Sequence, residues 1–156
     1  MSWAGARRRL WTVAAVALAV AGADQLTKAL AVWLIPPGGV SLVPGYVDLV
    51  LVANPGAAFG LLAGLNGARW VLAAAAAVAV VLGLWLAATH KAGVGGALGL
   101  IVGGAAGNLI DRLRLGHVVD FVDLHWGELH WPAFNLADAA ITVGAVWLGW
   151  QLVRRS

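Results

Sequence analysis

Four stretches of the chain are long and apolar enough to cross a lipid bilayer as helices. They cover residues of about 10–34, 70–89, 93–110 and 134–153. A helix needs about 20 residues to cross the roughly 30 Å of hydrocarbon. A soluble domain of 156 residues could not bury this much apolar surface, because 62% of the residues are hydrophobic and only 11% are charged. The sequence therefore predicts an all-α membrane protein with four transmembrane helices, in one domain that covers residues 1–156.

The positions of Lys and Arg predict how the helices are oriented. Basic residues gather at the cytoplasmic ends of spans. One side of the predicted bundle has the larger set: Arg7, Arg8, Arg9, Lys91, Arg154 and Arg155. The other side has Arg69, Arg112 and Arg114. Both termini are therefore expected in the cytoplasm, and the connections at about 35–69 and 111–133 are expected outside.

Two other interpretations of the basic residues were considered. The N-terminal arginines, the apolar run and a small-residue stretch at 21–23 are typical of a cleaved secretory signal. The apolar character resumes beyond Lys28, which favours an uncleaved first helix. The net charge of +3 and pI of about 10.2 do not indicate nucleic-acid binding, because the positive charge lies mostly in two terminal clusters that act as topology signals.

The first outer connection carries a β-rich segment between helices 1 and 2. Residues 40–52 are rich in β-branched and aliphatic side chains, with Pro44 and Gly45 as a turn signal. This pattern predicts a small hairpin or sheet on the outer membrane surface. Residues 54–60 follow as a turn-rich, apolar loop suited to contact with a lipid or an extended peptide. The whole segment of residues 40–60 is a candidate lid over the functional site.

Seven acidic residues in so apolar a chain each need an explanation. Asp24 and Lys28 lie one helical turn apart, as an internal ion pair or as part of a polar site; the sequence leaves both open. Asn108 precedes Asp111 and Arg112 by one turn, and an Asp111–Arg112 pair at the polar end of the helix is expected. Three acids are interpreted as ordinary solvated loop residues: Asp48, Asp123 and Glu128.

Asp120 and Asp138 are the remaining acids. They have no evident basic partner, and their neighbours in the sequence are not typical of a solvent-exposed acid. Asp120 lies among β-branched and aromatic residues, and Asp138 lies in about the first turn of the fourth helix. They are 18 residues apart, so the intervening loop can fold back and bring them together. Two carboxylates that share a site hold one proton between them near neutral pH. This is the requirement of an aspartic peptidase, in which one carboxylate activates water and the other supplies a proton.

Other kinds of catalytic site have little support in the sequence. Cysteine is absent, and serine occurs only outside the apolar segments and outside any nucleophile-elbow pattern. The loop histidines His117, His125 and His130 do not match the H-E-x-x-H pattern, and no metal site or cofactor is expected.

The chain resembles the bacterial lipoprotein signal peptidases (signal peptidase II) over essentially its whole length. The resemblance rests on five blocks in the expected order, at residues 24–28, 54–60, 107–112, 118–121 and 134–138. It implies that Asp120 and Asp138 are the catalytic pair. It also implies a set of residues that line or support the site: Asp24, Lys28, Asn54, Gly56, Asn108, Asp111, Arg112, Asn135 and Ala137.

The resemblance further implies an aspartic endopeptidase of the bacterial inner membrane, with its site near the extracytoplasmic face. Its expected partners are membrane lipid and prolipoproteins, which it would cut immediately before the diacylglyceryl-modified cysteine. Two alternatives were weighed. A proton-coupled transporter would place its charges at several depths, whereas these acids gather at one face. A non-catalytic assembly subunit would not explain two acids in apolar settings.

Overall fold

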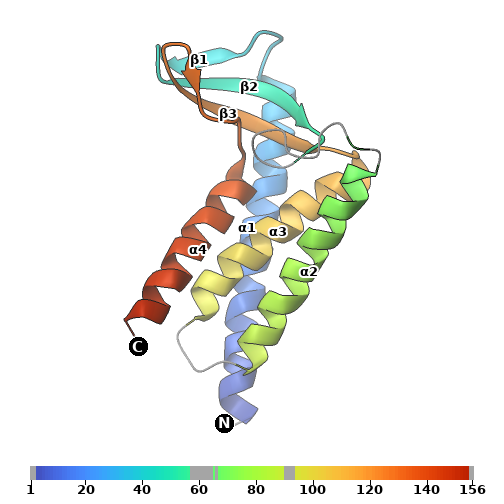
Figure 1. The fold of residues 1–156 in the computed structure, drawn as a ribbon, viewed down its shortest axis with the longest axis vertical. Helices are drawn as coiled ribbons and strands as arrows, with labels where there is room; N and C mark the ends of the chain where they lie inside the picture. The colour runs from blue at the N-terminus through green and yellow to red at the C-terminus, as the bar shows by residue number, and fades with distance from the viewer. Residues whose placement is uncertain (1–2, 57–64, 66, 90–93, 155–156) are drawn as a thin grey trace.

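The structure is a computed structural model that describes residues 3–56, 65, 67–89 and 94–154. Its helices are α1 (Trp3–Leu34), α2 (Ala68–Thr89), α3 (Gly95–Arg114) and α4 (Leu136–Val153). Its strands are β1 (Val40–Val43), β2 (Val47–Asn54), β3 (Val118–Trp126) and β4 (Leu129–His130). The helices form a bundle, the sheet lies across one end of it, and both ends of the chain lie at the opposite end (Figure 1).

The ends of the helices follow from local sequence. α1 ends at Leu34, two residues before Pro36, because the residue that precedes a proline is disfavoured in a helix. α3 runs to Arg114, one turn beyond the expected end at 110, and Gly116 follows with a φ of +84°. Glycine adopts that left-handed conformation without a steric penalty, so it ends the helix and turns the chain toward β3.

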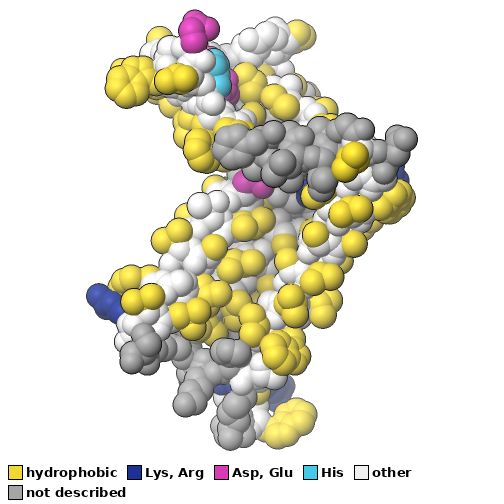
Figure 2. Space-filling model, viewed as in Figure 1, with side chains coloured by type: hydrophobic (Ala, Val, Ile, Leu, Met, Phe, Trp, Pro, Cys, Tyr) yellow, Lys and Arg dark blue, Asp and Glu magenta, His cyan; other side chains and the backbone are white. Residues whose placement is uncertain are grey.

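Three helices are long and apolar enough to cross a membrane among the described residues, over Gly5–Leu34, Ala68–Thr89 and Leu136–Val153. α3 falls short because its glycines and the polar residues of its last two turns lower its hydropathy. Hydrophobic side chains cover most of the helical part of the face seen in Figure 2.

α3 is the central helix and packs against each of the other three. Small residues make this contact close. A Cβ added to Gly103 would lie 2.7 Å from the carbonyl oxygen of Ala17 in α1, and one added to Gly104 would collide with the carbonyl oxygen of Ala137 in α4. Such close backbone approach is how helices associate in lipid, where burial of apolar surface gives little driving force.

The predicted outer hairpin is present, but the sheet is larger than the sequence suggested. The strand order is β1-β2-β3-β4, so two strands come from the second outer connection, which was expected to be a loop. β2 and β3 are antiparallel, with Val52 opposite Asp120 and Asn54 opposite Val118. The β-branched run around Asp120 supplies a partner for the open edge of β2, and this run was the signal for a strand.

The buried polar residues gather at one end of the bundle, whereas a cluster of buried apolar residues lies toward the other end. The apolar core lies toward the chain termini and is built from α1, α2 and α3: Val13, Ala17, Ala87, Val94, Leu98 and Val102. The buried polar residues lie at the sheet end: Asp24, Lys28, Asn108, Asp111, Asp120 and Asn135. The fold therefore gathers its buried polar groups where the sheet meets the helices.

Candidate active site

Asp120 lies on β3 and is buried, with only 1% of its surface exposed. Its carboxylate accepts hydrogen bonds from two side-chain amides, at 2.7 Å from Asn135 Nδ2 and at 2.8 Å from Asn54 Nδ2. Asn54 ends β2, so the pairing of β2 with β3 brings it beside this carboxylate. The connection between α1 and α2 thus supplies a hydrogen-bond donor to an acid in the connection between α3 and α4.

Asp138 lies in the first turn of α4. It forms a reciprocal capping box with Asn135: the Asp138 amide donates to Asn135 Oδ1 at 3.0 Å, and the Asn135 amide donates to Asp138 Oδ2 at 3.3 Å. Such a box satisfies backbone groups that the first turn of a helix leaves unpaired. Asn108 Nδ2 donates to the other carboxylate oxygen, Oδ1, at 2.8 Å. The carboxylate therefore has a fixed orientation.

Two asparagines connect the acids. Asn135 Nδ2 lies 2.7 Å from Asp120 Oδ1 and 3.2 Å from Asn108 Oδ1, and Asn108 in turn donates to Asp138. The fold-back of the chain that makes this possible is held by Phe134, whose amide donates to Val122 O at 3.0 Å. The structure thus joins Asp120 and Asp138 in one polar network, as the fold-back expected from the sequence requires.

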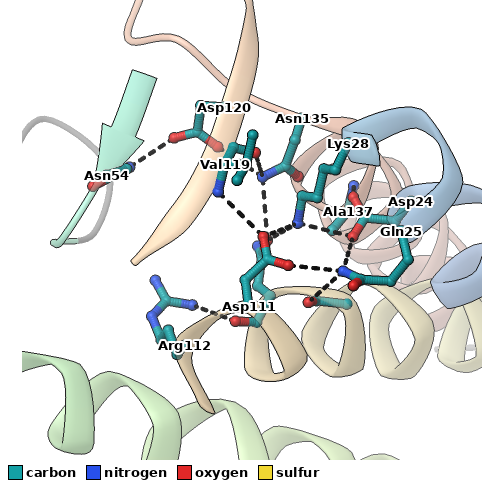
Figure 3. A network of polar contacts seen from close by, with 12 residues as sticks. Asp24, Gln25, Lys28, Asn54, Asp111, Arg112, Val119, Asp120, Asn135 and Ala137 are labelled. Atoms are coloured by element: carbon teal, nitrogen blue, oxygen red, sulfur yellow. Dashed lines mark hydrogen bonds and ion pairs between the residues drawn. The ribbon is translucent and has the colours of Figure 1, made fainter. Parts of the chain in front are cut away.

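A buried lysine organises the other side of this network (Figure 3). Lys28 Nζ lies 2.8 Å from both Asp24 Oδ2 and Asp111 Oδ2, and it donates to Asn108 Oδ1 at 3.0 Å. The Asp24–Lys28 pair is therefore both an ion pair and part of the polar site. Asp24 Oδ1 also accepts from the Ala137 amide at 2.9 Å, which ties α1 to the start of α4.

The expected pairing of Asp111 with Arg112 is wrong. Asp111 is not in an outer loop but in α3, where it accepts from Lys28 and from the Val119 amide at 3.1 Å. Consecutive residues on a helix point in different directions, so the two side chains diverge. Arg112 instead donates to two backbone carbonyls, to Gly56 O at 3.1 Å and Asn108 O at 3.4 Å.

Gln25 is a residue of this network that sequence reasoning missed. Its Nε2 donates to Asp111 Oδ1 at 2.8 Å and to Gly107 O at 3.3 Å. A Cβ on Gly107 would lie 2.5 Å from Asp24 Oδ2, so the glycine leaves room for the acid. The signal was the position of Gln25 inside the first motif block, next to Asp24.

An open cavity of about 530 Å³ adjoins the network. Four polar side chains line it, those of Asn54, Asn108, Arg112 and Asp138. The rest of the lining is almost entirely apolar: Val118, Leu124, Trp131, Pro132, Ala133, Phe134, Ala139, Ile141, Thr142 and Val143. A mostly apolar cavity with a few convergent polar groups is typical of a substrate site.

Burial changes the acidity of Asp120. Loss of water around the carboxyl raises its pKa from 3.8 to about 6, the hydrogen bond from Asn54 opposes this rise, and the charge of Asp138 adds to it. A carboxyl group in this state is half-protonated near pH 6 and can give or take a proton close to neutral pH. Asp138 lines the cavity and Asp120 lies buried behind the lining, so the network links a group that can exchange a proton near neutral pH to an acid that faces the cavity.

Gly56, in the second motif block, contacts residues of the site, whereas the loop acids Asp48 and Asp123 contact histidines away from it. Gly56 donates its amide to Asn54 Oδ1 at 3.0 Å, whereas residues 57–60 of that block lie outside the described residues. Asp48 and Asp123, expected to be solvated, lie 3.2 Å from His125 Nε2 and 2.8 Å from His130 Nδ1. Within the described ranges, no three His, Asp or Glu side chains are arranged to hold a metal ion.

The chain is similar to known proteins over most of its length. The profile of the family described as signal peptidase (SPase) II matches residues 16–154. A lipoprotein signal peptidase of Paraburkholderia phymatum is 47% identical over 143 residues, covering 90% of this chain and 86% of that protein. One from Oleidesulfovibrio alaskensis is 45% identical over 144 residues, covering 89% and 92%. A bacterial membrane enzyme solved in meso at 1.9 Å resolution superposes with a TM-score of 0.80 at 27% identity, over 93% of this chain and 94% of that one.

Proposed function

The chain belongs to the signal peptidase II family, and from this membership we propose that Asp120 and Asp138 are the catalytic pair of an aspartic endopeptidase. The protein is a multi-pass membrane protease with the function of a lipoprotein signal peptidase. The observation that carries the dyad proposal is the Asn108–Asn135 bridge, which joins the two carboxylates beside an apolar cavity.

The two acids take different roles in this mechanism. Loss of water on burial, with a smaller contribution from the charge of Asp138, raises the pKa of Asp120 to about 6, and we assign the proton of the pair to Asp120. Asp138 lines the cavity and accepts a proton from a water molecule, whose oxygen then bonds to the scissile carbonyl carbon. Asp120 gives its proton to the carbonyl oxygen. Collapse of the tetrahedral intermediate breaks the C–N bond: Asp138 gives the proton it took from water to the leaving nitrogen, and a hydroxyl of the intermediate returns a proton to Asp120.

The supporting residues hold this pair in place. Asn54, Asn108 and Asn135 orient the carboxylates, and Lys28 forms ion pairs with both Asp24 and Asp111 behind them. Arg112 fixes the loop at Gly56 beside the cavity, and the backbone amide of Ala137 anchors α4 to α1. In this proposal each of these residues positions the reacting groups or the substrate.

The proposed substrate is a prolipoprotein cut immediately before its diacylglyceryl-modified cysteine. That bond joins a hydrophobic signal to a lipid-bearing residue, so it lies at the edge of the membrane. The proposed topology has four spans, including α3, which packs among three helices that are each apolar enough to span. Both termini are cytoplasmic, and the sheet and site lie at the extracytoplasmic end, opposite the termini (Figure 1).

The placement of buried polar groups argues against the alternative of a proton-coupled transporter. A relay needs polar groups along the whole path across the membrane. The buried polar side chains of the described residues lie at the sheet end, and the buried cluster toward the termini is purely apolar. This distribution favours a peptidase.

Cleavage of a defined substrate tests the proposed function. The purified protein, in detergent, is given one prolipoprotein with and without the diacylglyceryl group. We expect cleavage of the modified form only, with mass spectrometry finding the modified cysteine at the new N-terminus. Cleavage at another bond, or equal cleavage of the unmodified form, would contradict the substrate proposal.

The acidity of Asp120 predicts the pH dependence of the reaction. The active pair holds one proton, and the ionisation of Asp120, with its pKa of about 6, removes it. Because only the protonated pair is active, kcat/KM is expected to fall as the pH rises above about 6, by about tenfold per pH unit. Initial rates at low substrate concentration between pH 4 and 9 measure this limb. A rate that is constant from pH 5 to 9 would exclude a shared proton on Asp120.

A further inference from the structure

One face of α4 carries an apolar stripe that begins at the catalytic end of the helix. Ala139, Thr142, Val143, Val146 and Trp150 follow the spacing that places residues on one side of a helix. Val146 is 70% exposed and Trp150 is 51% exposed. The one hydroxyl in the stripe, on Thr142, donates to the carbonyl oxygen of Asp138 at 2.9 Å, so it requires no other partner.

This stripe is continuous with the cavity at the site. A shallow groove of about 390 Å³ is lined by Thr142, Val143, Val146, Trp147 and Trp150, without any polar surface. Thr142 and Val143 line both this groove and the larger cavity that contains Asp138. From Asp138 to Trp150 the path covers 12 residues of helix, or about 18 Å at 1.5 Å per residue.

We propose that this stripe binds the hydrophobic helix of the signal peptide, antiparallel to α4. The inference rests on the proposed function, which places the scissile bond at Asp138. The residues before that bond must then leave the cavity toward the cytoplasmic side. The apolar part of a signal peptide has about 7–15 residues, which is about 10–22 Å as a helix and matches the length of the stripe.

A helical peptide fits the physical setting of this groove. Backbone groups in lipid must be hydrogen-bonded within their own segment, and a helix does this over its whole length. The outward face of α2, with Val78 and Val81, is equally apolar but lines neither the cavity nor the groove. It therefore serves as the matched control surface.

Disulfide cross-linking tests the proposal directly, because the chain has no native cysteine. Single cysteines are placed by Val143→Cys, Val146→Cys and Trp150→Cys, and on the control face by Val78→Cys and Val81→Cys. All are made in an Asp120→Asn background, which keeps bound prolipoprotein intact. The substrate carries one free cysteine about 5, 8 or 12 residues before the cleavage point, the distances that an antiparallel helix places beside positions 143, 146 and 150.

We expect the cross-links to follow the register of an antiparallel helix pair. Each α4 cysteine should cross-link best to its matched substrate position, with a yield at least about tenfold above the α2 controls, because a bound segment has a high effective concentration. Equal yields on α2 and α4, or yields that do not follow the register, would overturn the proposal. Labelling of Val146→Cys by a photoreactive acyl chain of the substrate, without peptide cross-links, would assign the groove to lipid and would also overturn it.

A kinetic measurement separates this inference from the proposed function. Val146→Asn is expected to raise KM for the prolipoprotein about fivefold with kcat unchanged, because the contact is made equally in the ground and transition states. Val78→Asn, an equivalent change on α2, should leave both constants as in the parent. An unchanged KM in Val146→Asn overturns the inference, whereas a parent protein that fails to cleave prolipoprotein overturns the proposed function itself.

Discussion

Asp120→Asn and Asp138→Asn are each expected to lower kcat/KM for prolipoprotein cleavage by about 10³-fold or more. Loss of either carboxyl group removes a general acid or base, a contribution that alone is worth about 10²–10⁴-fold. The two losses should not add in the double variant, because the acids act as one unit with one proton. Single-turnover cleavage with excess enzyme measures all three variants.

Asp123→Asn is the matched control for this experiment. Asp123 lies on the same strand as Asp120, but its carboxylate contacts His130 rather than the polar network of the site. The Asp123→Asn variant should cleave prolipoprotein at the parent rate. Circular dichroism and thermal unfolding must show that each inactive variant is folded. A folded Asp120→Asn or Asp138→Asn protein with parent activity would refute the dyad.

Lys28→Met is expected to lower the free energy of unfolding by about 3–5 kcal/mol. Lys28 is 3% exposed and contacts Asp24 and Asp111 at 2.8 Å each, so its removal leaves two buried carboxylates without a countercharge. Breaking a buried ion pair by deleting one partner has this cost. Because Asp24 also accepts from the Ala137 amide, the docking of α4 on α1 should loosen as well. Unfolding of the purified protein in mild detergent measures the loss.

Two further variants serve as a control and a rescue for this measurement. Arg114→Met removes an exposed cation at the same end of the bundle, with a long, exposed hydrogen bond of 3.4 Å to Gln25 Oε1, and should change stability by no more than about 0.5 kcal/mol. Adding Asp111→Asn to Lys28→Met removes one of the two uncompensated charges and should recover part of the loss. If the double variant is less stable than Lys28→Met, repulsion between buried carboxylates is not the cause.

The sequence predicted those parts of the site that follow from local chemistry. Apolar length identified the helices, and the apolar setting of Asp120 and Asp138 separated them from the other acids. The Asp24–Lys28 contact followed from helical spacing. These inferences need only the neighbours of a residue along the chain or one turn away.

The parts that were missed depend on contacts between distant segments. Lys28 lies one turn from Asp24, but its second partner, Asp111, is on another helix, and no spacing rule reaches that far. Asp111 was assigned to its neighbour Arg112 for the same reason. β3 was interpreted as a loop because its partner strand, β2, lies some 70 residues earlier in the chain. The β-branched run was visible, but its pairing was not.

The order in which the network residues occur along the chain has a consequence for biogenesis. Lys28 lies on the first helix and Asn108 on the third, whereas Asn135 and Asp138 belong to the start of the last helix. Until the ribosome has translated the start of α4, the nascent protein has its lysine, its sheet strands and Asp120, but no second acid and no capping box. With Asp120 and Asp138 as the proposed catalytic pair, we expect activity to require the final helix, because a chain without it carries only one of the two acids.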